Sequence, residues 1–80
     1  MKRPKIVERK LGRHGADGLC WNDGVIEIDA RLKGKRRLEI LIHEIDHYLH
    51  PEKTEDEVEE DAKNLAQLLW SERVRIVDEA

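Results

Sequence analysis

Two hydrophobic patterns divide the chain near residue 34. Before it, short runs alternate apolar and polar positions between glycine-rich turns, and after it the apolar positions recur every three or four residues. Alternation is typical of strands, and the longer spacing is typical of amphipathic helices. We therefore expect one α+β domain over residues 1–80, with a small antiparallel β-sheet of two or three strands followed by a two-helix hairpin.

The strongest strand signal is a hairpin. Leu19-Cys20-Trp21 leads into Asn22-Asp23-Gly24, whose Asp-Gly pair favours a tight turn, and Val25–Asp29 returns as a strand with β-branched residues. Lys5–Arg9 is another predicted strand, and residues 12–18 hold three glycines and are expected to form a loop. The Val25–Asp29 strand is either central or an edge to which an extended peptide could add.

The helical half begins at about residue 35. The first helix is predicted over residues 35–50 and ends before Pro51, because proline disfavours helical geometry in the residue before it. The second starts at Thr54, since Thr54 to Glu57 matches a capping box, and continues to about Arg73. The short connection between them predicts that the helices pack against each other.

Each predicted helix has one apolar face that should contribute to the core. In the first helix this face consists of Leu38, Leu41, Ile45, Tyr48 and Leu49. In the second it consists of Val58, Ala62, Leu65 and Leu69, with Ala66 and Trp70 at its margins.

The polar face of the first helix carries the candidate chemistry. Residues 43–47 read HExxH, and at about 100° per residue His43 and His47 fall one turn apart on the same face, opposite the apolar one. Two imidazoles so placed can share a Zn²⁺ ion, and Glu44 beside them can take a proton from water as a catalytic base. Glu39 and Asp46 are expected to hydrogen-bond the histidine rings. The alternative is a pair of histidines on a solvated face.

A catalytic zinc usually has three protein ligands, so a further side chain must face the histidines. The candidates are His50, Glu55, Glu57 and Asp61. His50 lies roughly 10.5 Å from His43 along the helix axis, which is too far for one ion to bridge, and Glu57 is the capping-box partner. Glu55, close to the interhelix link, is the predicted third metal ligand, with Asp61 as runner-up. The alternative role for Glu55 is that of an anion favoured at a helix N-terminus.

These residues resemble the small HExxH zincin-like metallopeptidases that bacteriophages commonly encode, and more distantly the gluzincins and the ImmA/IrrE-type peptidases. The resemblance covers most of the chain after the N-terminal arm: Gly18-Leu19-Cys20, Ile26-Glu27-Ile28-Asp29, Arg31-Leu32, Arg36-Arg37-Leu38-Glu39, Leu41-Ile42-His43-Glu44, Leu49, Pro51, Glu55, Val58, Ala62, Leu65-Ala66 and Leu69-Trp70. It implies a minimal zincin-like core, ligation by His43, His47 and Glu55, and peptide-bond hydrolysis with Glu44 as general base. The chain departs from the family at His50, where a small or acidic residue is more frequent.

Charge is distributed unevenly along the chain. Residues 1–37 hold 11 Lys/Arg against 5 Asp/Glu, and residues 38–80 hold 4 against 13, so a basic β-rich half should attract an acidic helical half. The basic residues are Lys2, Arg3, Lys5, Arg9, Lys10, Arg13, Arg31, Lys33, Lys35, Arg36 and Arg37. With a net charge of -3 and no recognised binding motif, we do not expect a nucleic-acid partner.

The remaining expectations concern setting and partners. The single Cys20 excludes an internal disulfide, and no apolar run reaches the length of a membrane span, so we expect a cytoplasmic protein without a membrane partner, in the host cytoplasm if a phage encodes it. The expected partner is a peptide or protein substrate, and Tyr48 and His14 are candidate oxyanion donors. The alternative function is a non-catalytic zinc-binding interaction module of the same fold.

Overall fold

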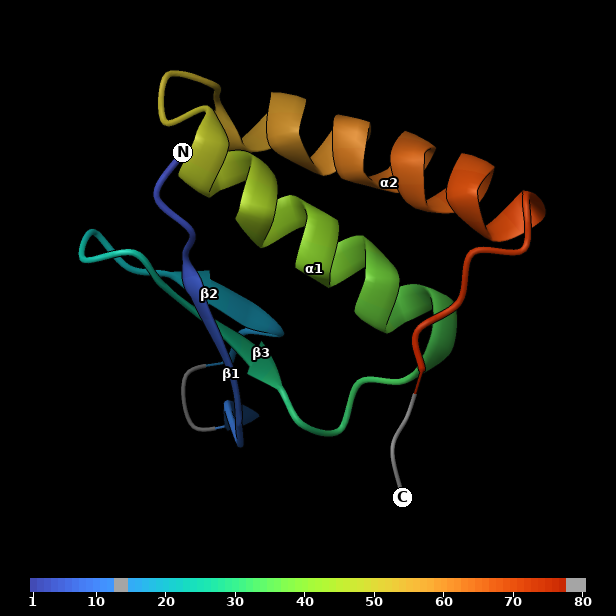
Figure 1. The fold of residues 1–80 in the computed structure, drawn as a ribbon, viewed down its shortest axis with the longest axis horizontal. Helices are drawn as coiled ribbons and strands as arrows, with labels where there is room; N and C mark the ends of the chain where they lie inside the picture. The colour runs from blue at the N-terminus through green and yellow to red at the C-terminus, as the bar shows by residue number, and fades with distance from the viewer. Residues whose placement is uncertain (13–14, 78–80) are drawn as a thin grey trace.

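The computed structural model describes residues 1–12 and 15–77, in which a three-stranded sheet precedes two helices. The elements in chain order are β1 (Lys5–Arg9), β2 (Gly18–Cys20), β3 (Val25–Asp29), α1 (Gly34–Leu49) and α2 (Glu55–Ser71). α1 lies between the sheet and α2, giving three layers (Figure 1). The predicted α+β fold, a small sheet followed by a helix hairpin, is confirmed.

The sheet is mixed rather than antiparallel throughout, with the strand order β1-β3-β2. β2 and β3 form the predicted antiparallel hairpin, whose turn is closed by the backbone N–H of Gly24 donating to the Trp21 carbonyl at 3.0 Å. Gly24 has a φ of 88°, a conformation that glycine adopts without strain. β1 instead pairs in parallel with β3, which makes β3 the central strand and leaves β2 at an edge.

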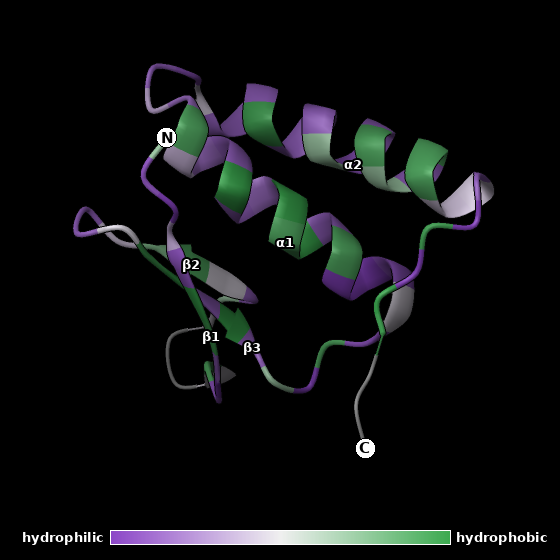
Figure 2. Ribbon diagram, viewed as in Figure 1, coloured by the Kyte–Doolittle hydropathy of each residue, from purple (hydrophilic) through white to green (hydrophobic). Residues whose placement is uncertain are grey.

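The apolar core lies on both sides of α1. Ile26 and Ile28 of β3 pack with Ile40 of α1, and the buried residues of α2 are Val58, Ala62 and Ala66. Figure 2 shows hydrophobic stretches on both helices and on the sheet.

The predicted apolar face of α2 is wrong at one position. Leu65 is 46% exposed, whereas Ala66, expected at the margin, is fully buried. Ala62 and Ala66 lie one turn apart on the buried side of α2, and small residues there allow a close helix approach. In α1, Leu49 is also exposed, because it is the last residue of the helix.

The link between the helices is fixed at both ends. The Glu57 backbone N–H donates to Thr54 Oγ1 at 3.2 Å and the Thr54 N–H donates to Glu57 Oε1 at 3.1 Å, so the predicted capping box is present. Lys53 Nζ lies 3.0 Å from an Asp46 carboxylate oxygen on α1 and 3.1 Å from Asp61 on α2. This lysine joins the last turn of α1 to the second turn of α2.

The charged halves do not pair as the sequence predicts. Arg9 pairs with Glu27, Arg31 with Asp29 and Arg37 with Glu8, all within the basic half, while Lys53 and Lys63 pair with acids of the helical half. Within residues 1–12 and 15–77, only the neighbouring Arg36–Glu39 pair joins the two halves. In the same part of the chain, neither helix is long and apolar enough to cross a membrane.

Candidate metal centre

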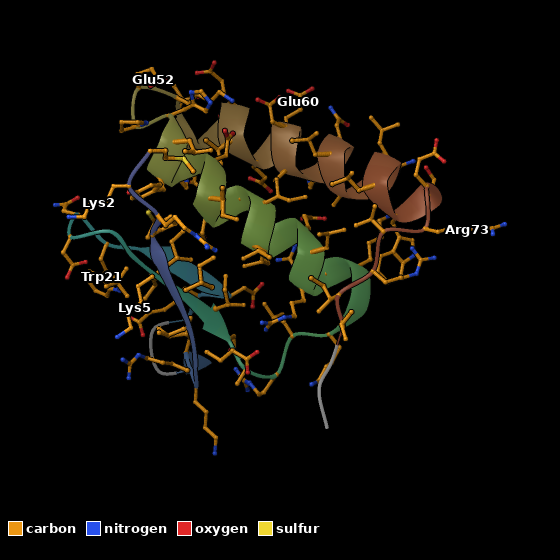
Figure 3. The ribbon with its side chains drawn as sticks, in the orientation of Figure 1. Lys2, Lys5, Trp21, Glu52, Glu60 and Arg73 are labelled. Atoms are coloured by element: carbon orange, nitrogen blue, oxygen red, sulfur yellow. The ribbon has the colours of Figure 1, made fainter. Side chains whose placement is uncertain are left out.

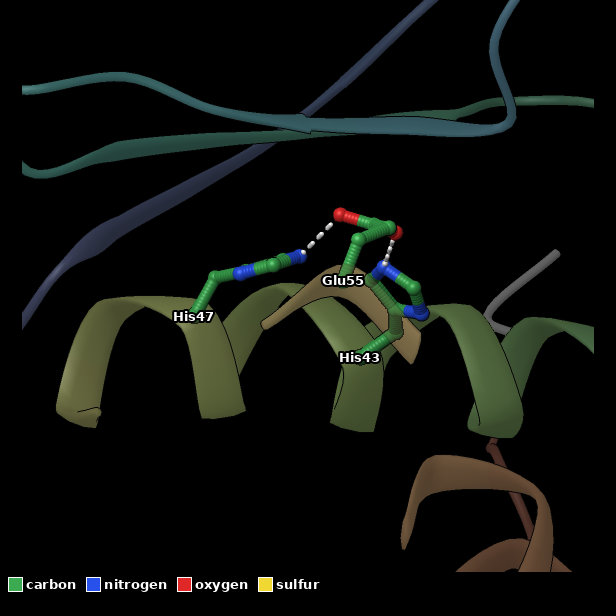
Figure 4. Close-up of side chains that lie close together, drawn as sticks. All are labelled: His43, His47 and Glu55. Atoms are coloured by element: carbon green, nitrogen blue, oxygen red, sulfur yellow. Dashed lines mark hydrogen bonds and ion pairs between the residues drawn. The ribbon is translucent and has the colours of Figure 1, made fainter. Parts of the chain in front are cut away.

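The carboxylate of Glu55 bridges the two histidines of the HExxH pattern. Glu55 Oε1 lies 2.7 Å from His43 Nε2, and its other oxygen lies 2.8 Å from His47 Nε2 (Figure 4). Donor atoms of the three residues all lie within 4.8 Å of one another. The helical spacing brings the imidazoles together, and the capped first turn of α2 brings Glu55 to them.

The donor atoms match those that zinc prefers. Two imidazole nitrogens and one carboxylate oxygen form a three-ligand set of the kind found in catalytic sites, and Glu55 remains largely solvent-exposed. The His43 and His47 side chains are 14% and 24% exposed, so they lie at the border of the core rather than opposite to it. The helical spacing predicted them opposite the core on the assumption of one buried face, whereas α1 is covered on two sides.

Glu44 is buried beside these histidines. It is only 7% exposed, and burial raises the pKa of its carboxyl group. Positive charge on His43 and His47 would lower that pKa, and the nearby Glu55 raises it. Burial has the largest effect, because removal of water disfavours the charged form.

The close approach of β2 buries Glu44. A Cβ atom on Gly18 would lie 2.9 Å from Glu44 Cγ and 2.8 Å from Ile40 Cγ2, so only glycine fits between the strand and the helix. Gly18 belongs to the segments that carry the family resemblance, but no role was predicted for it. A glycine ending a loop and opening a strand was the available signal.

The other candidate ligands are engaged elsewhere. Glu57 completes the capping box, and Asp61 pairs with Lys53. His50 lies 3.4 Å from Glu52 and 4.0 Å from Asp46, on the link side of α1. Among the four candidates, the structure brings Glu55 to the histidines.

Two expected supporting roles are not seen. Glu39 accepts a hydrogen bond from Arg36, and Asp46 accepts from Lys53, so within the described residues neither carboxylate is bonded to the rings of His43 or His47. Each acid instead binds a nearby cation. The helical spacing alone does not show whether an acid will bind a cation or a histidine.

Of the two expected oxyanion donors, one is bonded elsewhere and the other lies outside the described residues. Tyr48 donates its hydroxyl to the Lys2 carbonyl at 2.6 Å and so is already occupied. His14 lies outside the residues that the structure describes.

A solvent-open hollow of about 620 Å³ lies over the centre. It is lined by β2 and the hairpin turn on one side and by the helices on the other: Gly18, Leu19, Cys20, Trp21, Asn22, His43, Glu44, His47, Tyr48, Pro51 and Glu55. Cys20 is half-buried in this wall, where burial raises the pKa of its thiol. The histidines, Glu44 and Glu55 are therefore accessible from one hollow.

Neither a protein-family model, nor a curated protein, nor a solved structure matches this chain. The residues of the centre are therefore the basis for assigning a function.

Proposed function

We propose that the chain is a zinc-dependent metallopeptidase. The observation that carries the proposal is the Glu55 carboxylate lying between His43 and His47, with Glu44 buried beside them. His43, His47 and Glu55 would hold the metal. Zinc supplies Lewis acidity, which makes water acidic enough to deprotonate near neutral pH and polarises a carbonyl group.

Glu44 would act as the general base. It would accept a proton from the attacking water and return it to the leaving amine, so that a peptide bond is replaced by a carboxyl group and an amine. Its burial supports this role, because a carboxylate with a raised pKa is a stronger base. The close approach of Gly18 leaves no room for a methyl group between the strand and this side chain.

The edge of the sheet supports a peptide as substrate. β2 is an outer strand, and its residues Gly18, Leu19 and Cys20 line the hollow. An edge strand presents backbone N–H and C=O groups to which an extended peptide can add. The sequence offered Val25–Asp29 as the edge for a peptide, but this strand is central, and the outer strand β2 takes that role. We expect the protein to act in the cytoplasm.

Metal analysis of matched variants tests the proposal. The purified protein should contain about one zinc per chain, and His43→Ala should lose it, whereas His50→Ala serves as a control for the loss of any imidazole and should retain it. Full zinc occupancy in His43→Ala would refute the site.

Peptide cleavage by Glu44→Gln tests the chemistry separately. This variant should keep zinc and the fold but lose hydrolysis of unfolded protein substrates, by about 100-fold or more, the scale of general-base catalysis. Zinc at full occupancy in a wild-type protein that cleaves no substrate would instead favour the non-catalytic interaction module.

A further inference from the structure

The hollow over the centre meets a second hollow at Glu44, and the two are lined by different kinds of residue. This second hollow, of about 250 Å³, shares Gly18, His43, Glu44 and Glu55 with the first. The two therefore meet at the centre and form one cleft with two ends. A peptide crossing the centre would place residues in both.

The end toward the hairpin turn is apolar and aromatic. Beyond the shared residues and His47, its lining consists of Leu19, Cys20, Trp21, Asn22, Tyr48 and Pro51, none of which carries a charge at neutral pH. Trp21 is 48% exposed, whereas tryptophans are on average largely buried.

Both aromatic rings at this end are held in place by their polar tips. The Trp21 indole N–H donates to Glu27, which is itself paired with Arg9, and Tyr48 donates to the Lys2 carbonyl. Their polar atoms are thus already bonded, and what remains for a ligand is apolar ring surface. Rings fixed in advance lose little conformational entropy when a ligand binds.

The other end is acidic. Beyond the shared residues it is lined by Asp17, Glu39 and Glu59 with Ile40 and one cation, Arg36. Arg36 is bound to both Asp17 and Glu39, at 2.6 and 2.7 Å, so its charge is already compensated. This end therefore has excess negative charge.

Glu44 lies at the junction of the two ends, where its carboxylate can meet a ligand. The residue is 7% exposed and lines both hollows, and no hydrogen bond from another described residue reaches its carboxylate. Among the described residues no fully buried side-chain oxygen or nitrogen lacks a partner, so the Glu44 carboxylate opens into the cleft, where a bound molecule can reach it.

We infer that the cleft selects peptides with an aromatic or large aliphatic residue on one side of the bond at the centre and a lysine or arginine on the other. The apolar residue would contact Trp21, and the cation would lie near Glu59 and Glu39. This inference rests on the proposed peptidase function and specifies its substrate class.

The test uses short fluorescent peptides that differ only in the two central residues: Phe-Lys, Lys-Phe, Phe-Asp, Asp-Phe, Ala-Lys and Lys-Ala. Cleavage is measured as kcat/KM with the zinc-loaded protein, and binding is measured with zinc-loaded Glu44→Gln by fluorescence polarisation. One of the two Phe/Lys orders should exceed its Asp counterpart by about two- to fivefold, as exposed charges allow. It should exceed its counterpart with alanine in place of phenylalanine by about tenfold, the scale of discrimination by an apolar pocket.

Two variants assign the ends, each with a matched control. Trp21→Ala should reduce the Phe-over-Ala preference alone, whereas Leu68→Ala, an exposed leucine of α2 that lines neither hollow, should not. Glu59→Gln should reduce the Lys-over-Asp preference alone, and Glu60→Gln should not; Figure 3 shows Glu60 on the outer side of α2, away from Trp21. High salt should weaken the Lys preference and leave the Phe preference unchanged.

Failure of the inference differs from failure of the proposed function. Equal cleavage of all peptides, equal binding of all peptides, or no binding of any would overturn the inference. Preferential binding in the expected order without cleavage by the wild-type protein would support the inference while refuting peptidase activity.

Discussion

Gly18 and Glu44 are packed so closely that a methyl group on the glycine would lie 2.9 Å from Glu44 Cγ. This contact joins the edge strand to the residue proposed as the general base. The position of the strand therefore determines the environment of the carboxylate, and a change on the strand should be detectable in the chemistry.

We expect Gly18→Ala to lower both stability and activity. The added methyl group must displace Ile40 or Glu44, and overpacking of this kind typically costs about 1–3 kcal/mol. Chemical denaturation and peptide cleavage would measure the two effects. Gly12→Ala is the matched control, because its methyl group would meet only the flexible guanidinium of Arg31, at 3.3 Å. Equal effects of the two substitutions would contradict the proposed contact.

Glu55→Ala should weaken zinc binding by at least about 100-fold, because removal of a group that merely supports a ligand already costs about 10–100-fold. The reason is the bridging position of its carboxylate between the histidines. Competition with a chelating dye gives the affinity. Asp56→Ala removes an adjacent acid from the same helix turn and should leave zinc binding unchanged. Unaltered affinity in Glu55→Ala would remove it from the ligand set.

Lys53→Met should lower the melting temperature and weaken zinc binding by about tenfold, the lower end of the range for groups that orient ligands. Its hydrogen bonds to Asp46 and Asp61 raise the pKa of its ammonium group. The contribution of the charged Lys53 to the stability of the fold is therefore complete at neutral pH. It is lost only as the pH rises through that raised pKa.

Lys63→Met tests whether any lysine on this helix would give the same result. Lys63 pairs with Glu59 at 3.6 Å on an exposed surface and should contribute little. A melting temperature for Lys53→Met as high as that of Lys63→Met would contradict a stabilising role for the Lys53 ion pairs.

The Asp29–Arg31 pair should make stability dependent on pH in acid. Hydrogen bonds from the Arg31 side chain and backbone lower the pKa of Asp29 to about 2. The folded state thus keeps the carboxylate ionised where the unfolded chain protonates it. The stabilisation is present above about pH 4 and disappears as the pH falls to about 2.

Urea denaturation of Asp29→Asn at several pH values measures this contribution. The variant should be less stable than the wild type above pH 4, and the difference should shrink toward pH 2. Asp23→Asn, in the exposed hairpin turn, should show no such trend. A difference that is constant with pH would mean that the ion pair does not carry the effect.

The elements with strong local signals were predictable. The Asp23-Gly24 turn, Pro51 and the Thr54 capping box each determine backbone geometry within a few residues, and the structure has all three features. The meeting of Glu55 with the histidines was also within reach, because a short link leaves few arrangements for two helices.

Long-range packing was not predictable in the same way. The parallel pairing of β1 with β3 joins segments about twenty residues apart, and nothing local in Lys5–Arg9 specifies its direction. Glu44 was expected beside the histidines on the polar face, but α1 is covered by the sheet as well as by α2, so a wheel with one buried face could not show its burial. In α2 the expected positions of Leu65 and Ala66 are exchanged, because the small alanine faces the closely packed α1.

The placement of His43, His47 and Glu55 on one helix hairpin has a consequence for folding. The ligand set belongs to a continuous stretch of chain, residues 43–55, so bringing its atoms together requires closure of only a short loop. The wall against Glu44, in contrast, comes from a strand that must return from much earlier in the chain. Short-range contacts form faster than long-range ones. We therefore expect a refolding chain to gain the capacity to capture zinc before it gains the capacity to hydrolyse.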